Sequence, residues 1–325
     1  MKVCIYGAGA VGGHLAARLA DGGAEVSIIA RGAHLAAIRE NGLRVDARDA
    51  VLQSRPSATD DPATLGPQDV VVVTVKAPSL PQIAEGIAPL LDAKTQVVFL
   101  MNGIPWWYFH DHDGPLEGTR LGRIDPDGKI WRAIDPSRVI GGVAYTACTV
   151  TAPGIIRAAN PRNRIILGRP DSRLTPIVTD LAETMRAGGL EVELTDTIRN
   201  AIWEKLLMNL VGGSLGILTE SAMGDALSHP AVEALARDIA TEGAAIATAL
   251  GCDAGDIEAG LSKLKTSTHK QSILQDLNLG RAMEIDALLV APTELARMVG
   301  ITTPILDRIV GLAVLRARSA GLYAG

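Results

Sequence analysis

A glycine-rich turn near the amino terminus constrains the fold of this chain more than any other feature. Residues 7–13 have the sequence Gly-Ala-Gly-Ala-Val-Gly-Gly, which contains a G-x-G-x-x-G element. An apolar run at residues 2–6 precedes it, and small and apolar residues recur at helical spacing over residues 11–20. A strand, a glycine turn and a helix in this order form the phosphate-binding unit of dinucleotide-binding folds. The alternative is a tight turn of the same shape that binds no ligand.

Each glycine of the turn has an expected role. The first makes the tight turn, the second lets the backbone approach a pyrophosphate, and the third allows close packing of helix on strand. The pyrophosphate then lies at the helix N-terminus, where backbone N–H groups and the helix dipole favour an anion. The expected cofactor-binding residues of the turn are Gly7, Ala8, Gly9, Ala10, Val11 and Gly12.

The residue after the second expected strand indicates which dinucleotide binds. Residues 25–30 predict that strand, and Arg31 follows it directly. An NAD site usually has an aspartate or glutamate here, which accepts a hydrogen bond from the ribose 2′-hydroxyl, whereas a guanidinium suits the 2′-phosphate of NADP. We therefore expect NADP (NADPH) as the cofactor. The alternative is an arginine that is solvated at the end of a strand.

Strands and helices alternate through the first part of the chain. A helical pattern at residues 80–91 lies between two of the expected strands. Apolar runs predict strands at residues 2–6, 25–30, 70–75, 97–101, 139–150 and 164–167. This alternation predicts an α/β fold whose N-terminal domain is a Rossmann-type doubly wound parallel sheet.

Two polar residues follow strands of this expected sheet. Lys76 follows the third strand and Asn102 the fourth, and the carboxyl ends of parallel strands form the ligand crevice of such folds. Lys76 is expected to meet a phosphate, a ribose or a substrate carboxylate, and Asn102 a ribose or the nicotinamide. An Asn-Gly pair at a strand end is by itself more typical of a simple turn.

Strand-like runs end near residue 196, and helical periodicity continues to the C-terminus. We expect an NADP-binding Rossmann-type domain at residues 1–196 and an all-helical domain for substrate binding and catalysis at residues 197–325. Between them, residues 106–138 break the alternation with Gly, Pro, Asp and Arg, so we expect a long surface excursion with a hairpin around residues 129–131. The last helix is expected to open at Thr303-Pro304, and its predicted apolar face consists of Ile305, Leu306, Ile309, Val310, Leu312 and Ala313.

The first helix of the second domain carries a candidate acid. Its apolar face is predicted to consist of Ile198, Ile202, Trp203, Leu206, Leu207, Leu210 and Val211. Lys205 and Asn209 are four residues apart, hence neighbours along one edge of this face. An amine at the border of buried surface is a plausible proton donor, because partial desolvation lowers its pKa. From this helix alone, a lysine that merely covers its own helix is the favoured alternative.

Charge and cysteine content exclude several classes of function. The formal net charge is −5 and the basic residues are scattered, so no nucleic-acid surface is expected. Three widely spaced cysteines without a Cys-x-x-Cys pair indicate neither a disulfide framework nor a zinc site. Every long apolar stretch is interrupted by Gly, Pro or charge, so no membrane span is expected. We expect a cytoplasmic protein.

One run of residues has the composition of a metal site. Residues 110–113 have the sequence His-Asp-His-Asp, in a loop rich in glycine and proline. The spacing alternates, and no distant partner is identified in the sequence. A solvated loop is therefore the expected structure, and no metal is predicted.

Taken in order along the chain, the motifs resemble those of the ketopantoate reductase family, in particular a longer-chain branch of it. The likeness covers nearly the whole chain and includes motifs from both expected domains. It rests on the glycine turn, Ala30-Arg31, Val75-Lys76, Asn102-Gly103, residues 203–209 (Trp-Glu-Lys-Leu-Leu-Met-Asn), residues 272–276 (Ser-Ile-Leu-Gln-Asp) and residues 284–286 (Glu-Ile-Asp). It implies reduction of a 2-oxo acid to a 2-hydroxy acid by NADPH, with ketopantoate as the leading substrate.

The resemblance also implies roles for single residues. Lys205 matches the general acid that protonates the carbonyl oxygen as hydride arrives, and Glu284 a carboxylate that orients or tunes it; the alternative for Glu284 is a surface helix residue. Asn209 matches a substrate-binding amide, and Ser272 a hydroxyl that contacts the substrate. In the same way, Arg31 matches the contact to the 2′-phosphate, and Lys76 and Asn102 match residues that line the cofactor and the substrate pocket.

Two departures from the family pattern leave the substrate open. Gly213 stands where the family often has a second asparagine, and Met223 where a third is expected. Loss of two amide donors weakens the recognition of a polyhydroxylated substrate. One alternative is a more apolar 2-oxo acid that touches Trp106 or Trp107. The other interpretation of these two side chains is that they pack the loop and contact no substrate.

Two further alternatives concern the activity itself. A β-hydroxyacid or opine type of dehydrogenase also joins a Rossmann domain to a helical one, and a non-catalytic NADPH-binding sensor would keep only the cofactor site. A sensor has no need of the proton donor that this chain retains. Many proteins of this architecture form a homodimer, but the sequence shows no clear interface.

Overall fold

The computed structural model describes residues 1–160 and 162–325, which separate into two units. The first comprises Met1–Met101, Trp106–Arg120 and Asp127–Ile198, and the second comprises Asn102–Pro105, Leu121–Pro126 and Arg199–Gly325. Two short segments from the middle of the chain therefore belong to the second unit, and nothing in the sequence analysis predicts this. The assignment of cofactor binding to one domain, and of substrate binding and catalysis to the other, stays a prediction.

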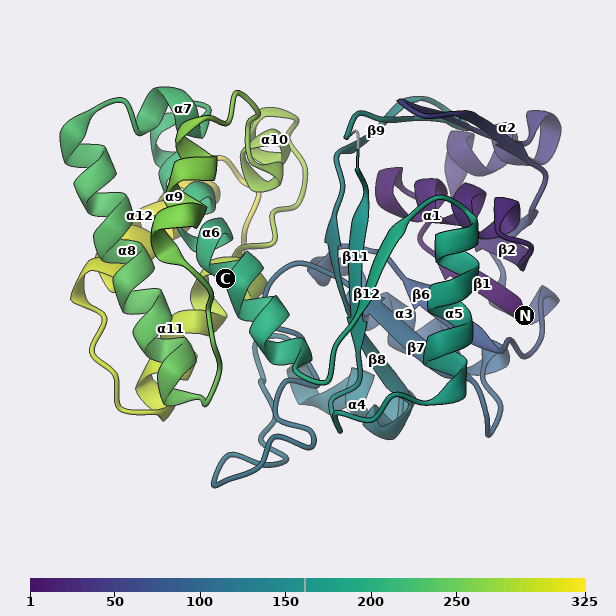
Figure 1. Ribbon diagram of the computed structural model, residues 1–325, viewed down its shortest axis with the longest axis horizontal. Coiled ribbons are helices and arrows are strands. Elements are labelled where there is room, and N and C mark those ends of the chain that lie inside the picture. The colour runs from purple at the N-terminus through teal and green to yellow at the C-terminus, as the bar shows by residue number, and fades with distance from the viewer. Residues whose placement is uncertain (161) are drawn as a thin grey trace. The chain divides into compact units, whose positions relative to one another are not determined.

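The first unit is built on an eight-stranded sheet (Figure 1). Its strands are β1 (Lys2–Tyr6), β2 (Glu25–Ile29), β5 (Ser57–Thr59), β6 (Val70–Val73), β7 (Gln96–Leu100), β8 (Val139–Tyr145), β11 (Arg164–Gly168) and β12 (Glu191–Leu194). Six of them run parallel in the order β5-β2-β1-β6-β7-β8, and β11 pairs antiparallel with β8, with β12 beyond it. The order reverses between β1 and β6, which is where doubly wound sheets bind their ligands. The predicted Rossmann-type sheet is confirmed, with an antiparallel edge added to it.

Helices cover both faces of this sheet. The α-helices of the unit are α1 (Ala10–Asp21), α2 (Gly32–Asn41), α3 (Leu80–Gly86), α4 (Lys129–Ala133) and α5 (Pro176–Ala187), and short 3-10 turns span Pro62–Thr64, Ala77–Ser79, Ala88–Leu90, Pro126–Gly128 and Pro136–Arg138. In Figure 1, α5 lies in front of the strands and α3 behind them. The C-terminal ends of α1 and α5 meet so closely that a Cβ added at Gly188 would lie 1.8 Å from the carbonyl oxygen of Arg18. Glycine is therefore required where the two helices meet.

A smaller sheet of four strands lies against α1. Its strands are β3 (Leu43–Ala47), β4 (Val51–Ser54), β9 (Cys148–Ala152) and β10 (Ile155–Ala158), in the order β4-β3-β10-β9. The prediction of one strand over residues 139–150 is wrong, because β8 ends at Tyr145 and β9 belongs to the other sheet. The chain bends between them at Thr146, whose hydroxyl donates to Asn163 Oδ1 at 2.7 Å. A side-chain hydrogen bond of this kind gives no periodic signal in the sequence.

The expected surface excursion at residues 106–138 is confirmed for residues 111–120, which form a largely exposed loop, and is wrong for residues 106–109 and 129–131. Trp106, Trp107, Tyr108 and Phe109 are each at most 1% exposed, and residues 129–131 lie in helix α4 rather than in a hairpin. Trp106 meets Phe99 and Trp131 edge to face, with ring centroids 5.4 and 5.7 Å away. Large rings contribute strongly to burial in a chain with only 3% aromatic residues, which explains why residues 106–109 fold inward.

The second unit is helical around one central helix. Its helices are α6 (Ile198–Thr219), α7 (Met223–Ala226), α8 (Pro230–Ala249), α9 (Ile257–Lys265), α10 (Ser272–Asn278), the π-helix η6 (Asp286–Val290), α11 (Ala291–Met298) and α12 (Pro304–Ser319). All seven residues of the apolar face predicted for α6 are buried. On α12 the prediction for Leu312 is wrong, because this side chain is 51% exposed while Leu306 and Ala313 are fully buried.

Helix α6 is long and apolar enough to cross a membrane by length and composition alone. However, 72% of its most apolar window is buried inside the protein. Its glycines show how it is enclosed: a Cβ at Gly216 would contact Leu274 of α10 and Met223 of α7. This is the packing of a core helix.

Candidate active site

The glycine turn adopts the geometry that its sequence predicts. Gly7 has φ +103°, and a Cβ on it would lie 2.5 Å from Val75 Cγ1. A Cβ on Gly12 would lie 2.3 Å from the carbonyl oxygen of Gly7 and from Thr74 Oγ1. By contrast, a Cβ on Gly9 would meet no atom within 4 Å. Gly7 and Gly12 are therefore required by the fold, whereas the space beside Gly9 is open to a ligand.

The start of α1 is suited to an anion. Gly9 is the N-cap residue, no side chain caps the helix, and its first turn contains no acidic residue. The orphan N–H groups of a helix start need a partner, and the helix dipole favours a negative one. Ala8, Ala10 and Val11 lie in this turn beside the open position at Gly9. The residues present thus fit the pyrophosphate of a dinucleotide.

Arg31 follows β2 and Lys76 follows β6, the two strands that pair with β1 on either side. Arg31 is exposed as the N-cap residue of α2, and its Nη1 donates to Gln82 Oε1 of α3 at 3.0 Å. Lys76 is exposed and caps the 3-10 turn that follows β6.

The candidate acid, Lys205, lies in the second unit together with Asn102 and Glu284. Lys205 Nζ on α6 donates a hydrogen bond to Asn102 Oδ1 at 2.7 Å. The residue is half-buried. Burial lowers the pKa of Lys205 to about 8, and the charge of Glu284 opposes this by raising it. Such an amine gains and loses a proton near physiological pH, as a general acid must.

Glu284 is a buried residue, with 5% of its surface exposed. It lies just ahead of the π-helix η6 and is not the surface helix residue of the alternative interpretation. Asp276 on α10 is also buried, at 3% exposure. In the sequence, Asp276 stands out only as the last residue of the motif at residues 272–276. Its apolar neighbours Ile273 and Leu274 do not indicate that the carboxyl group is buried.

The remaining expected residues lie along α6 and α10. Asn209 is half-buried one turn beyond Lys205, and Ser272 is the exposed first residue of α10. The start of α10 lies close to α6, because a Cβ on Gly213 would be 3.4 Å from Ile273 Cγ2. A Cβ at position 213 would therefore be in ordinary van der Waals contact with Ile273. Met223 is fully buried under α6.

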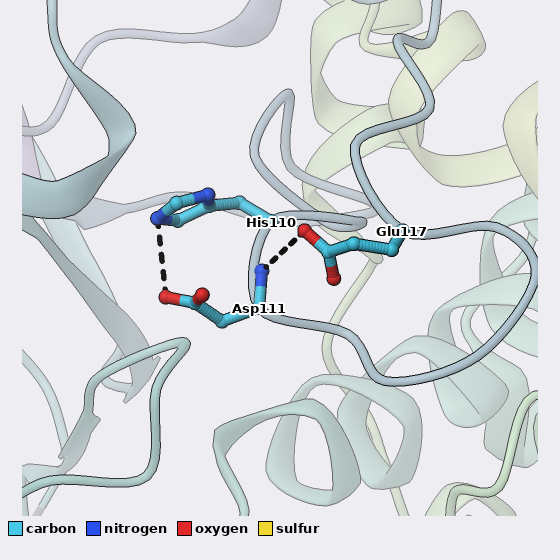
Figure 2. A group of neighbouring side chains, drawn as sticks. All are labelled: His110, Asp111 and Glu117. Carbon is cyan, nitrogen blue, oxygen red and sulfur yellow. Dashed lines mark hydrogen bonds and ion pairs between the residues drawn. The ribbon is translucent and has the colours of Figure 1, made fainter.

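A second group of polar side chains lies in the loop after the buried aromatic run (Figure 2). His110 Nε2 is 3.2 Å from Asp111 Oδ2, and the Glu117 carboxylate accepts the backbone N–H of Asp111 at 3.1 Å. The ligand atoms of these three residues lie within 4.8 Å of one another. Glu117 belongs to the same loop, which turns back so that this carboxylate approaches the run, and none of the three residues comes from a distant segment of the chain. The Glu117 carboxylate accepts backbone N–H groups of this loop, so its position has a structural explanation that needs no metal ion. The absence of a metal stays a prediction.

The sequence and the fold match those of known proteins over nearly the whole chain. The family described as ketopantoate reductase PanE/ApbA matches residues 3–172, and its C-terminal domain family matches residues 197–317. The chain is 44% identical to 2-dehydropantoate 2-reductase of Mesorhizobium japonicum, over the full length of both, and 27% identical to that of Halobacterium salinarum, over 98% and 99% of the two chains.

Solved structures agree with this assignment. A crystal structure from Ralstonia solanacearum, provisionally described as a ketopantoate reductase, is 41% identical and superposes with a TM-score of 0.91, covering 99% of each chain. The 2-dehydropantoate 2-reductase of Geobacter metallireducens is 27% identical with a TM-score of 0.83, over 96% of this chain and 99% of its own. With matching sequence families in both units, a Rossmann-type sheet and a helical unit that carries the expected lysine, this chain belongs to the ketopantoate reductase family.

Proposed function

We propose that the protein reduces 2-dehydropantoate (ketopantoate) to pantoate with NADPH. The observation that carries this proposal is the hydrogen bond from Lys205 Nζ to Asn102 Oδ1, on a lysine whose pKa is lowered to about 8. The Mesorhizobium japonicum relative, which is named for this reaction, matches the chain from end to end. The free cysteines Cys4, Cys148 and Cys252 fit the reducing cytoplasm, which is the compartment we propose.

In this proposal the two predicted domains have different roles. Residues 1–196 hold NADPH, with the pyrophosphate at the start of α1 beside Gly9 and the 2′-phosphate at Arg31; Lys76 and Asn102 line the cofactor. When bound there, NADPH would supply the hydride for the carbonyl carbon. Residues 197–325 supply the proton and, through Asn209 and Ser272 together with Asn102, the contacts that hold the 2-oxo acid.

Lys205 acts on the carbonyl oxygen. As the hydride arrives, that oxygen develops negative charge, which an ammonium group both stabilises and neutralises by giving up its proton. The Asn102 carbonyl oxygen orients the Nζ group before this transfer. The negative charge of Glu284 keeps the lysine protonated despite its burial, because it raises the pKa that desolvation lowers. Afterwards the amine regains a proton from water.

The pH profile provides the first test. Reduction needs the protonated lysine, so activity should be full below the pKa and decline above it. We expect kcat/KM for the 2-oxo acid to fall about tenfold per pH unit above a value of about 8, the pKa of Lys205. Steady-state rates at saturating NADPH between neutral and alkaline pH measure this. A profile that stays flat through this range would contradict the assignment of Lys205 as the acid.

Arg31→Ala tests the cofactor. Loss of a charge-assisted contact to the 2′-phosphate should raise KM for NADPH by about 10- to 100-fold and leave KM for NADH nearly unchanged. Arg39→Ala is the matched control, because Arg39 is another exposed arginine on α2, and its Nε donates to the carbonyl oxygen of Ala58. Equal effects of Arg31→Ala on both cofactors would remove the argument for NADP.

A more apolar 2-oxo acid is the second candidate substrate. Gly213 and Met223 give no amide to the pocket, and both positions are occupied by packing: Gly213 faces Ile273, and Met223 is fully buried. The tryptophans proposed to contact such a substrate do not support it, since Trp106 and Trp107 are each only 1% exposed. Oxidation of NADPH against a panel of 2-oxo acids, with and without amines, separates the two candidates and also an opine-type reaction. Tight NADPH binding without any turnover across the panel would favour the sensor.

A further inference from the structure

The segment that follows Glu284 is a π-helix, η6, at Asp286–Val290. Single π turns are rare, and they are frequent at functional sites. Here the carbonyl oxygen of Ala287 accepts the backbone N–H of Ile104 at 2.9 Å. The π turn therefore offers a backbone acceptor to a segment that is far away in sequence and belongs to the same unit.

Gly103 lies directly on this turn. Its φ is +84°, and a Cβ added to it would lie 2.3 Å from the carbonyl oxygen of Ala287 and 2.5 Å from its carbonyl carbon. Those are backbone atoms of the π turn, so any side chain at position 103 would push the two segments apart. The residue next to Gly103 is Asn102, which accepts the hydrogen bond from Lys205. The close contact of Gly103 with the backbone of Ala287 thus determines where the Asn102 amide lies.

The start of the π turn is anchored from two other places in the second unit. The hydroxyl of Tyr323, near the C-terminus, donates to Asp286 Oδ1 at 2.5 Å. Arg123 Nη1 lies 3.3 Å from the same oxygen, and Arg123 Nε donates to Glu294 Oε1 on α11 at 2.7 Å. Burial and the neighbouring Asp286 raise the pKa of Tyr323 to about 12, so its hydroxyl keeps its proton and remains a donor.

We propose that η6 is the positioning element of the proton donor, with Gly103 and Tyr323 as positioning residues. The turn connects the two groups that act on Lys205: Glu284 lies at its start, and Asn102 is held by the Gly103-Ile104 peptide that docks on Ala287. The Tyr323–Asp286–Arg123 contacts hold the turn in place. This inference rests on the proposed role of Lys205 as the acid.

Gly103→Ala tests whether the contact of Gly103 with Ala287 positions Asn102, and Gly251→Ala is its matched control. Both glycines have positive φ, at +84° and +74°, but a Cβ on Gly251 would meet no atom within 4 Å. The two variants therefore share the backbone strain and differ in the clash with Ala287. We expect Gly103→Ala to lower kcat by about 100-fold, as displacements of about 1 Å do. Indistinguishable kcat values for the two variants would overturn the proposal.

Tyr323→Phe tests the anchor. It removes one hydroxyl and changes no charge, because Tyr323 is neutral below its pKa of about 12. We expect a smaller loss in kcat, of about 3- to 10-fold, since one hydrogen bond is lost while Arg123 still holds Asp286. Arg316→Gln is the control. Arg316 lies on α12, which precedes Tyr323 in the chain, and its substitution breaks an ion pair with Glu220. A kcat for Tyr323→Phe equal to that of Arg316→Gln would remove Tyr323 from the proposal.

A titration of Lys205 separates this inference from the proposed function, because it needs no substrate. The lysine side-chain NMR resonance that disappears in Lys205→Arg identifies the group, and its pH dependence gives the pKa. In Gly103→Ala the ammonium loses the acceptor at Asn102, so its pKa should fall below the wild-type value of about 8, while Gly251→Ala keeps that value. A titration of Gly103→Ala that coincides with the wild type overturns the positioning role. If the wild type instead turns over no 2-oxo acid at all, the proposed function fails while this titration still stands.

Discussion

Lys205→Ala is expected to lower kcat by about a thousandfold, because the carbonyl oxygen then gains charge without an ammonium to stabilise or protonate it. The dissociation constant of NADPH should stay the same, since the residues proposed to bind it all belong to other segments of the chain. Steady-state turnover and a direct binding titration with NADPH measure the two quantities. The split between them distinguishes loss of chemistry from loss of the cofactor site.

Two further variants control this experiment. Lys263→Ala removes an exposed lysine from α9 of the same unit and should leave kcat unchanged. Lys205→Arg keeps a positive charge but cannot release its proton at neutral pH, so it should be nearly as slow as the alanine variant. Turnover of Lys205→Ala near the wild-type rate would rule out the assignment.

The second large effect separates two glycines of the same turn. In Gly12→Ala the added methyl group clashes at 2.3 Å with the Gly7 carbonyl oxygen and with Thr74 Oγ1, so the free energy of unfolding should fall by about 3 kcal/mol. In Gly9→Ala the methyl group meets no protein atom within 4 Å, and the residue has an ordinary φ of −69°. Stability should then be kept, or should rise by about 0.5 kcal/mol.

The effects on NADPH should run the other way. The methyl group of Gly9→Ala occupies the space left for the pyrophosphate, so NADPH affinity should fall by at least about tenfold although the protein is folded. Urea unfolding measures the free energy of unfolding of each variant, and a titration with NADPH measures its affinity for the cofactor. We expect Gly12→Ala to lose mainly stability and Gly9→Ala to lose mainly NADPH affinity. A Gly9→Ala protein that binds NADPH as tightly as the wild type would mean that the pyrophosphate does not lie there.

The local parts of the fold could be predicted from the sequence because spacing alone determines them. The strand, the glycine turn and α1 follow from adjacent residues, and the buried face of α6 follows from helical periodicity. The bend at Thr146 and the inward fold of residues 106–109 could not be predicted in this way. They depend on a side-chain hydrogen bond and on packing between rings from different segments.

The same reasoning applies to the candidate site. Lys205 and Asn209 could be paired because they are four residues apart on one helix. The hydrogen bond between Lys205 and Asn102 spans 103 residues of sequence, and the contact of Tyr323 with Asp286 spans 37. No periodic pattern connects such positions. Nor could the burial of Glu284 be predicted, since it lies outside the regular helices.

The distribution of indole side chains gives each unit its own optical reporter. Trp106, Trp107 and Trp131 belong to the first unit, and Trp203 lies fully buried on α6 of the second. In a variant that retains only Trp203, intrinsic fluorescence follows the helical unit alone, and a variant that lacks Trp203 follows the sheet-containing unit. Denaturation curves of the two variants would then reveal whether both halves of the chain melt together or in sequence.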